Sequence, residues 1–217
     1  MPKPTLPDRP IRLHGMTLSG HSHRVRLFCA LLGVPIEWIE VDVFKGEQRR
    51  PAFLALNPVG QVPVIEDGDV VVADSNAILV YLARRYGDAS RWLPEDALGA
   101  AQVQRWLSLA AGELAHGPAS ARISCLVGRE PTPAQLKTAH RLLGIMEQTL
   151  ATRPFLVGAA PTLADIAMYS YTAHAPEGAV TLEPYPALRG WIARIEALPG
   201  FVGMARSAVP APQEIPA

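Results

Sequence analysis

The sequence predicts a mixed α/β domain followed by an all-helical domain. Up to about residue 87, segments with strand-like alternation and segments with helical periodicity follow one another, and beyond Pro94 only helical periodicity remains. A chain of 217 residues is long enough for two domains of this kind. We therefore expect one domain over residues 11–87 and a second over residues 95–207, separated by the polar stretch 88–94.

The first half of the α/β domain is predicted to form a strand, a helix and a strand. Residues 11–18 alternate between apolar and polar side chains, as a half-buried strand does. Apolar residues then recur at helical spacing over residues 24–33, where Gly33 is a typical helix stop. Residues 36–43 alternate again and predict a second strand, so this half is a βαβ unit.

The second half of the domain is predicted to be a ββα unit. After a short helix near residues 51–56, the apolar runs 62–65 and 70–73 flank a polar turn, which is typical of a hairpin. A helix is predicted from Asp74-Ser75 to Tyr86. In the second domain, apolar residues at helical spacing predict four helices, over residues 97–114, 134–150, 163–171 and 187–198.

Composition excludes several classes of protein. Twenty Lys and Arg balance twenty Asp and Glu, so no net charge draws the chain to nucleic acid or to an anionic membrane. We find no apolar run long enough to span a membrane and no secretory-type leader, so we expect a cytoplasmic protein. Cys29 and Cys125 stand far apart without a CxxC motif, which argues against a disulfide scaffold or a dithiol redox centre.

Four sequence blocks carry a family resemblance. They are residues 18–26 (LSGHSHRVR), 53–64 (FLALNPVGQVPV), 73–78 (ADSNAI) and 161–167 (PTLADIA). A βαβ unit followed by a ββα unit, with Pro63 at the start of the third strand, resembles the thioredoxin fold. Joined to a helical domain, it resembles the cytosolic glutathione transferases over about residues 11–205.

The resemblance implies an enzyme of detoxification. Residues 11–87 would bind glutathione as a co-substrate and activate its thiol, and residues 95–207 would form the pocket for a small hydrophobic electrophile. A cytoplasmic homodimer without a metal is implied as well. The alternatives are a non-catalytic protein that binds glutathione or an apolar ligand, a glutathione-dependent isomerase or dehalogenase, and a structural interaction domain.

Ser19 is the catalytic candidate that the resemblance indicates. It precedes Arg24 by five residues, as does the first serine of the zeta-class pattern Ser-Ser-Cys-x-x-Arg-Val-Arg, although Gly20 and His21 replace the second serine and the cysteine. A hydroxyl that donates to sulfur favours the thiolate form of a thiol. Ser22, which we expect to cap the following helix, and a backbone amide are the alternatives for this role.

The block at residues 53–64 and the segment before it imply contacts along the tripeptide. A cis Val62-Pro63 bond would turn the backbone of Val62 outward to pair with the cysteinyl backbone of glutathione, and Gln61 beside it could add a polar contact. Gln48 aligns with a delta-class histidine that faces the glycine carboxylate, where Lys45 or Arg49 could supply charge.

At the γ-glutamyl end, the resemblance places Asp74 on the ammonium and Ser75 on the carboxylate, because a helix N-terminus suits an anion. Asn76 stands where several classes have an arginine.

The remaining candidates are structural or lie in the second domain. Thr162 and Asp165 form a capping-box pattern that predicts a buried helix start. His116, Arg122 and Trp106 are candidates for the electrophile pocket, although helical periodicity favours the core for Trp106. His21 and His23 lack an evident third ligand, so we expect no metal site.

Overall fold

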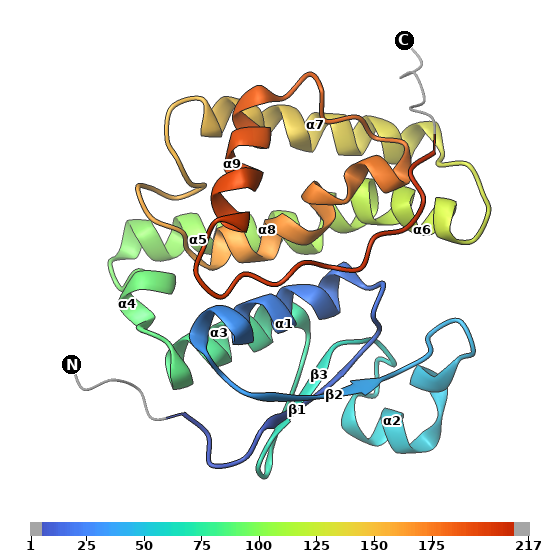
Figure 1. The fold of residues 1–217 in the computed structure, drawn as a ribbon, viewed down its shortest axis with the longest axis vertical. Coiled ribbons are helices and arrows are strands. Elements are labelled where there is room, and N and C mark those ends of the chain that lie inside the picture. Colours follow the sequence, from blue (N-terminus) through green and yellow to red (C-terminus); the bar gives the residue numbers. More distant parts are fainter. Residues whose placement is uncertain (1–5, 211–217) are drawn as a thin grey trace. The chain divides into compact units, whose positions relative to one another are not determined.

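In a computed structural model, which describes residues 6–210 apart from the side chain of Ala89, the chain forms two compact units. The first unit comprises the residues up to Leu93 together with Leu198–Ala205, and the second comprises Pro94–Ala197 together with the residues from Arg206 (Figure 1). The first unit contains the sheet, and the second is helical. This is the predicted fold class, a thioredoxin-like part followed by a helical part.

A four-stranded mixed sheet forms the centre of the first unit. The strands β1 (Ile11–Gly15), β2 (Ile36–Glu40), β3 (Val64–Asp67) and β4 (Val70–Ala73) lie in the order β2-β1-β3-β4. β1 runs parallel to β2 and antiparallel to β3, and β3 pairs antiparallel with β4. The βαβ and ββα units predicted from the sequence are therefore joined through β1 and β3.

The pairing register brings three chain segments to one edge of this sheet. His14 near the end of β1 pairs with Val64 at the start of β3, and Val64 pairs with Ala73 at the end of β4. Because β3 is antiparallel to both neighbours, the residues after β1, before β3 and after β4 all leave the sheet at the same edge. These are the segments that contain Ser19, Val62 and Asp74.

Helices cover the sheet of the first unit. They are α1 (Gly20–Leu32), the short η1 (Glu47–Arg49), α2 (Pro51–Leu56), α3 (Ser75–Tyr86) and α4 (Ala89–Trp92). Figure 1 shows α1 and α3 side by side along the sheet, with α2 apart from them. Successive side chains of β1 lie on opposite faces of the sheet. Leu13 is completely buried, while Arg12 and His14 line a hollow together with α2.

Several predicted boundaries in this unit were wrong. β1 ends at Gly15 and β2 at Glu40, three residues earlier than the alternation predicted in each case. α1 begins at Gly20 rather than at residue 24, because Ser19 caps it. Ser22, which we expected to be the cap, lies inside the helix and is completely buried. Polar side chains in the first turn of α1 concealed this start from a pattern of apolar residues.

Two segments outside the predicted sheet and helices also belong to the first unit. The stretch expected to be a polar boundary contains α4, whose Trp92 is buried with its ring centroid 5.0 Å from that of Phe28. The later segment Leu198–Ala205 returns to α1, where a His23 ring nitrogen, Nε2, lies 2.9 Å from the carbonyl oxygen of Val202. Both contacts join residues far apart in the sequence.

The second unit contains helices and no strand in its described residues. The predicted helices are present as α5 (Ala97–Ala111), α7 (Pro133–Leu150), α8 (Leu163–Ala173) and α9 (Pro186–Glu196). The sequence analysis missed a π-helical turn, η2 (Ala115–Ala119), a further helix, α6 (Ser120–Leu126), and a short 3-10 helix, η3 (Ala175–Gly178). Gly112 and Pro118 interrupt the apolar periodicity there, so this region resembled a loop.

The capping box at the start of α8 is confirmed. Thr162 accepts a hydrogen bond from the amide of Ala164, and Asp165 accepts one from the amide of Thr162 at 2.8 Å. Asp165 also accepts from Leu156 N and Trp191 Nε1, both at 2.9 Å, so one buried carboxylate joins α8, α9 and the preceding loop. Burial raises the pKa of Asp165, against the effect of these donors. Among residues 6–210, no helix is both long and apolar enough to cross a membrane.

Candidate active site

Ser19 occupies the N-cap position of α1 and is partly exposed. Its hydroxyl oxygen accepts a hydrogen bond from the amide of Ser22 at 3.2 Å. A hydroxyl has one proton and two lone pairs, so this contact uses a lone pair and leaves the proton of Ser19 to be donated. The same residue can therefore begin the helix and donate to a ligand beyond its N-terminus.

Hydrogen bonds from Ser19, Met16 and Thr17 hold the turn that contains Ser19. The Ser19 amide donates to the carbonyl of Met16 at 2.9 Å, and the Met16 amide donates to the hydroxyl of Ser22 at 3.2 Å. Thr17 donates both its amide and its hydroxyl to the carboxylate of Glu40, at 2.9 and 2.7 Å. Ser22 thus supports the turn from inside the protein and is less suited than Ser19 to meet a ligand.

The loop before β3 contains the predicted cis bond between Val62 and Pro63. Val62 lies outside the sheet ladder, whose first paired residue in β3 is Val64. The buried Asn57 holds the loop, because its side chain donates to the carbonyl of Gln61 at 2.8 Å and accepts from the amide of Val59 at 3.1 Å. The side chain of Gln61 is exposed.

Gly60 in this loop has a conformational role. Its φ of 67° lies in the left-handed region, and a Cβ there would lie 3.1 Å from the backbone oxygen of Gln48. A side chain would therefore be strained and crowded at this position. The close approach brings η1, which carries Gln48, against the loop that leads to Val62.

Gln48 is half-buried, and its environment differs from that of its charged neighbours. Within the described part of the chain, its side-chain oxygen is shielded from solvent and has no hydrogen-bond partner. Lys45, by contrast, is exposed and pairs with Asp42 at 2.8 Å, and this pairing raises the pKa of Lys45. Arg49 is exposed.

Asp74 and Ser75 form the start of α3, as predicted. Asp74 has a φ of 73°, which is rare for a residue other than glycine, and its Oδ1 accepts from the amides of Asn76 and Ala77 at 3.0 and 2.9 Å. Strained conformations of this kind concentrate at functional sites. Asp74 is exposed, while the next residue, Ser75, is only 4% exposed.

Arg24 joins the start of α1 to the start of α3. It is 1% exposed, and its Nη1 lies 2.9 Å from Ser75 Oγ and 2.8 Å from Asn76 Oδ1. His21 approaches the same serine, with its Nδ1 3.4 Å from Ser75 Oγ. Burial and the positive charge of Arg24 lower the pKa of His21 to about 3, so its imidazole is neutral at physiological pH.

Comparison with known proteins agrees with this geometry. Sequence models of the N-terminal and C-terminal domains of glutathione S-transferase match residues 18–85 and 113–199. Glutathione S-transferase 3 of Zea mays is 32% identical over 204 residues, which cover 88% of this chain and 91% of the maize protein. The chain belongs to the glutathione S-transferase family. Its activity is accordingly that of a glutathione transferase.

Solved structures of glutathione S-transferases lead to the same assignment. A glutathione S-transferase from Pseudomonas fluorescens superposes with a TM-score of 0.85 at 34% identity, covering 90% of this chain and 99% of that one. A glutathione transferase homologue from Drosophila mojavensis, solved with bound glutathione, has a TM-score of 0.79 at 28% identity and covers 88% and 89% of the two chains.

Arg24 and Asn57 contact candidate site residues of this glutathione transferase, and the sequence analysis assigned neither of them a role. A signal for Arg24 was present, because an arginine within the largely buried helix α1 is costly unless its charge is hydrogen-bonded. For Asn57 the sequence offered only a turn-forming Asn-Pro pair. Neither signal identifies the partner side chain, which comes from a distant segment in the case of Arg24.

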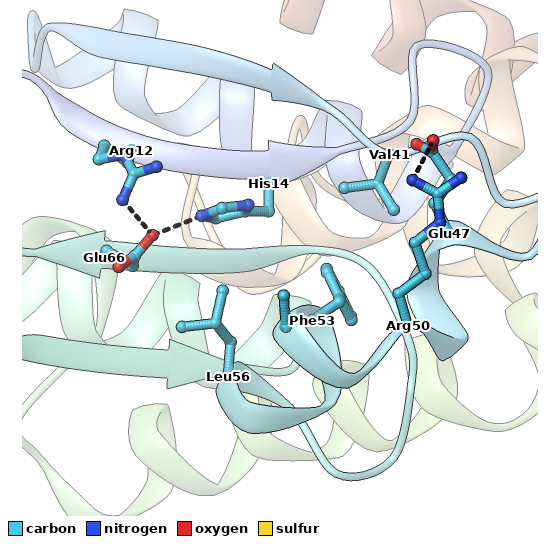
Figure 2. Close-up of a pocket in the computed structure, with 9 residues that line it drawn as sticks. Arg12, His14, Val41, Glu47, Arg50, Phe53, Leu56 and Glu66 are labelled. Atoms are coloured by element: carbon cyan, nitrogen blue, oxygen red, sulfur yellow. Dashed lines mark hydrogen bonds and ion pairs between the residues drawn. The ribbon is translucent and has the colours of Figure 1, made fainter.

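The first unit also contains a hollow of about 380 Å³ beside α2 (Figure 2). Its floor is apolar, formed by Val41, Phe53 and Leu56, and its rim carries ion pairs. Glu66 accepts from Arg12 at 2.8 Å and contacts His14 at 2.5 Å, while Arg50 pairs with Glu47 at 3.1 Å. None of the predicted glutathione contacts lines this hollow, and its charges pair with one another.

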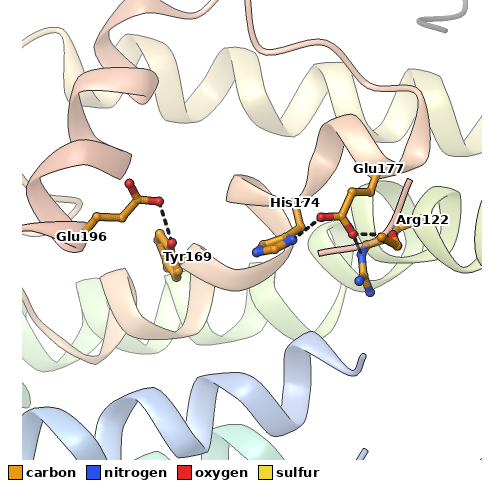
Figure 3. Close-up of polar contacts among 6 residues, drawn as sticks. Arg122, Tyr169, His174, Glu177 and Glu196 are labelled. Atoms are coloured by element: carbon orange, nitrogen blue, oxygen red, sulfur yellow. Dashed lines mark hydrogen bonds and ion pairs between the residues drawn. The ribbon is translucent and has the colours of Figure 1, made fainter. Parts of the chain in front are cut away.

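In the helical unit, two of the three candidates for the electrophile pocket are buried. Trp106 is 2% exposed and Arg122 is 1% exposed, whereas His116 is exposed. Arg122 donates its Nε–H to Glu177 at 2.7 Å, and Glu177 also contacts His174 (Figure 3). Burial raises the pKa of Glu177, but hydrogen bonds from Ser207, Arg122 and His174 outweigh burial and lower it. Arg122 is thus a partner in a buried ion pair. Among the described residues, no cluster of three or more metal-ligating side chains is present.

Proposed function

We propose that this glutathione transferase binds glutathione where β1 ends and β3 begins, with Ser19 stabilising the thiolate. The cysteinyl backbone pairs with Val62, and the γ-glutamyl end lies at Asp74 and Ser75. The glycine end points toward Gln48, with Gln61 nearby. The observation that carries the proposal is the contact of Arg24 with Ser75, because it joins the segment of Ser19 to the segment of Asp74.

Ser19 acts on the sulfur through its free hydroxyl proton. A thiol titrates near pH 8.5, and a hydrogen bond to a charged group is worth roughly 1.5–3 kcal/mol. At about 1.36 kcal/mol per pKa unit, donation from Ser19 lowers the thiol pKa by about one to two units. The N-terminus of α1, which Ser19 caps, contributes a smaller effect of the same sign.

Once ionised, the thiolate sulfur attacks the electrophilic carbon of the second substrate. A sulfur–carbon bond forms, and a leaving group departs with its electron pair or, in an addition, the neighbouring atom takes up a proton. Holding the two reactants together makes the step effectively intramolecular. Ser19 retains its own proton throughout and acts by hydrogen bonding alone.

The γ-glutamyl end meets two complementary groups. Its ammonium lies near the exposed carboxylate of Asp74, and its carboxylate lies at the N-terminus of α3, where Ser75 adds a hydroxyl donor. The twelve-residue helix α3 supplies the Ser75 amide and the positive end of its dipole, since Asp74 already accepts from the amides of Asn76 and Ala77.

The glycine end is held by the side chain of Gln48. Its shielded oxygen lacks a protein partner and can accept a hydrogen bond from the glycine N–H of glutathione, while its NH₂ group can donate to the glycine carboxylate. The backbone of Val62, which lies outside the sheet ladder, pairs with the cysteinyl residue as a short added strand.

The helical domain, residues 95–207, binds a small hydrophobic electrophile in this proposal, and residues 11–87 bind glutathione. We further propose a cytoplasmic homodimer with a role in detoxification. The relatives reported above are glutathione S-transferases, which favours transfer over isomerisation or non-catalytic binding.

Substitution at the start of α3 tests the binding mode. Asp74→Asn keeps a capping oxygen and tolerates a positive φ but removes the charge, and Ser75→Ala removes the hydroxyl. We expect each to weaken glutathione binding about tenfold or more in titration calorimetry, while the pKa of the bound thiol changes little.

A matched control separates binding from helix capping. Asp96 caps α5 in the other unit by accepting from the amide of Gly99, so Asp96→Ala removes a cap without touching the proposed site. We expect this variant to lose stability and keep wild-type affinity for glutathione. Wild-type affinity in both Asp74→Asn and Ser75→Ala would refute the proposed binding mode.

A further inference from the structure

Arg24 lies on the buried side of the proposed γ-glutamyl subsite and not on its solvent-exposed side. The guanidinium is almost fully buried, and one of its nitrogens, Nη1, contacts both Ser75 Oγ and Asn76 Oδ1 within 3 Å. Ser75 and Asn76 are the first two residues of α3. One buried cation therefore holds both polar side chains at the helix start that is proposed to meet a carboxylate.

The chemistry of arginine fixes the direction of both hydrogen bonds. A guanidinium can only donate, so Ser75 must accept through its oxygen and Asn76 must present its carboxamide oxygen to Arg24. The hydroxyl proton of Ser75 then points elsewhere, and the NH₂ group of Asn76 lies on the opposite side of its carboxamide. Both side chains present donors away from Arg24, which is the polarity that a carboxylate requires.

The neighbouring histidine completes this arrangement. His21 Nδ1 lies 3.4 Å from Ser75 Oγ, a position in which a neutral imidazole can accept the serine proton before a ligand takes it. Since burial and Arg24 keep His21 neutral, no second positive charge competes with Arg24 at physiological pH from this residue. The positive charge next to the start of α3 thus comes from Arg24 of α1.

We propose that Arg24 is a positioning residue for the γ-glutamyl carboxylate of glutathione, which orients Ser75 and Asn76 as donors and supplies their positive charge. The inference rests on the proposed function, because it requires that carboxylate to lie at the start of α3. Arg24 is then the partner of Asn76 and supplies, from α1, the positive charge that an arginine at position 76 would carry itself.

The test compares two ligands that differ only in this carboxylate. One is glutathione, and the other is the analogue in which γ-aminobutyrate replaces the γ-glutamyl residue. We expect wild-type protein to bind glutathione at least tenfold more tightly than the analogue in titration calorimetry. In Arg24→Gln, glutathione binding should weaken about tenfold or more while analogue binding stays within threefold, so most of the discrimination is lost.

Two variants of α1 serve as controls. Arg24→Lys keeps the charge and should recover part of the discrimination. Arg26→Gln makes the same change in charge at an exposed residue of the same helix and should leave the discrimination at its wild-type value. At saturating glutathione, kcat in Arg24→Gln should stay within about threefold of wild type while KM for glutathione rises, because Arg24 acts on binding and not on the sulfur.

Asn76→Asp gives a second test that leaves Arg24 in place. It exchanges a carboxamide for a carboxylate of the same size, which would pair with Arg24 and repel the ligand carboxylate. We expect this variant to lose the discrimination as well, so the inference stays testable if Arg24→Gln does not fold.

The outcomes separate the two proposals. If Arg24→Gln or Asn76→Asp weakens both ligands by the same factor, or keeps the wild-type ratio, Arg24 is only a structural residue and the inference is wrong. If wild-type protein itself binds the two ligands equally, the carboxylate does not lie at α3, and the proposed binding mode fails first.

Discussion

Ser19 shows how one side chain can serve a helix and a ligand at once. Its oxygen accepts from the Ser22 amide and caps α1, so its proton remains available for the sulfur of glutathione. Ser22 is instead enclosed by the protein and accepts from the amide of Met16. The sequence presented two serines three residues apart. Both hydroxyls accept from a backbone amide, and the burial of Ser22 is what distinguishes their roles.

His21 makes stability depend on pH. In the unfolded chain its imidazole gains a proton near pH 6.5, whereas in the folded protein burial and Arg24 lower its pKa to about 3. The unfolded state therefore binds more protons in this range, and stability is lost as pH falls from about 6.5 toward 3. Between pH 7 and pH 5, we expect this residue to account for a loss of about 2 kcal/mol.

Urea denaturation of His21→Asn at the two pH values measures this loss. Asn cannot titrate, so the drop in unfolding free energy between pH 7 and pH 5 should be about 2 kcal/mol smaller than in wild type. His140 and His174, whose pKa values burial also lowers, should maintain a residual slope. An unchanged drop in the variant would show that His21 is protonated in the folded protein.

At the scale of elements, the helix starts determine how the site is built. α1 and α3 both begin at the sheet edge where β1 ends, each with its own side-chain cap, Ser19 and Asp74. The sequence predicted the start of α3 correctly because Asp74 and Ser75 stand directly before an apolar periodic run. It misplaced the start of α1, because polar residues near that start, Ser22, His23 and Arg24, are buried for reasons that periodicity does not express.

The capping box of α8 is a structural element that should affect folding alone. Thr162 is 5% exposed, and its hydroxyl accepts from Ala164 N, so we expect Thr162→Ala to lower the free energy of unfolding by about 1 kcal/mol. Thr162→Ser keeps the acceptor and should retain most of it. Urea denaturation measures both, with glutathione affinity as the readout that should not change.

Thr132 provides a matched comparison for this element. It forms the capping box of α7 with Gln135 but is exposed, so water replaces its hydrogen bond at lower cost. We expect Thr132→Ala to be less destabilising than Thr162→Ala. Equal stability of Thr162→Ala and Thr162→Ser would contradict a role for the threonine hydroxyl in capping.

At the scale of the whole chain, the sequence predicted the order of elements well and their long-range contacts poorly. The βαβ-ββα order and the four long helices follow from local patterns of apolar residues. The contacts of Arg24 with Ser75 and of His23 with Val202 join positions 51 and 179 residues apart, and no local pattern specifies such pairs. The same reason explains why Arg122 was taken for a pocket residue, since its partner Glu177 comes from another helix.

The function likewise depends on segments that meet only in the fold. The turn after β1, the loop before β3 and the start of α3 contain Ser19, Val62 and Asp74, which are 43 and 12 residues apart in sequence, yet the sheet register places them at one edge. Each segment alone is an ordinary turn or helix cap. Together they offer a hydroxyl, a backbone segment outside the strand pairing and a helix N-terminus, which match three parts of glutathione in the proposed binding mode.

The central claim is that the Ser19 hydroxyl keeps the sulfur of bound glutathione ionised, and titration of the thiolate absorbance of the bound tripeptide against pH tests it most directly. In Ser19→Ala the pKa of the bound thiol should rise by about one to two units, with glutathione affinity within a few-fold of wild type. Ser19→Thr, which keeps the hydroxyl, and Ser22→Ala should both titrate like wild type. A wild-type pKa in Ser19→Ala, or a raised pKa in Ser22→Ala instead, would contradict the claim.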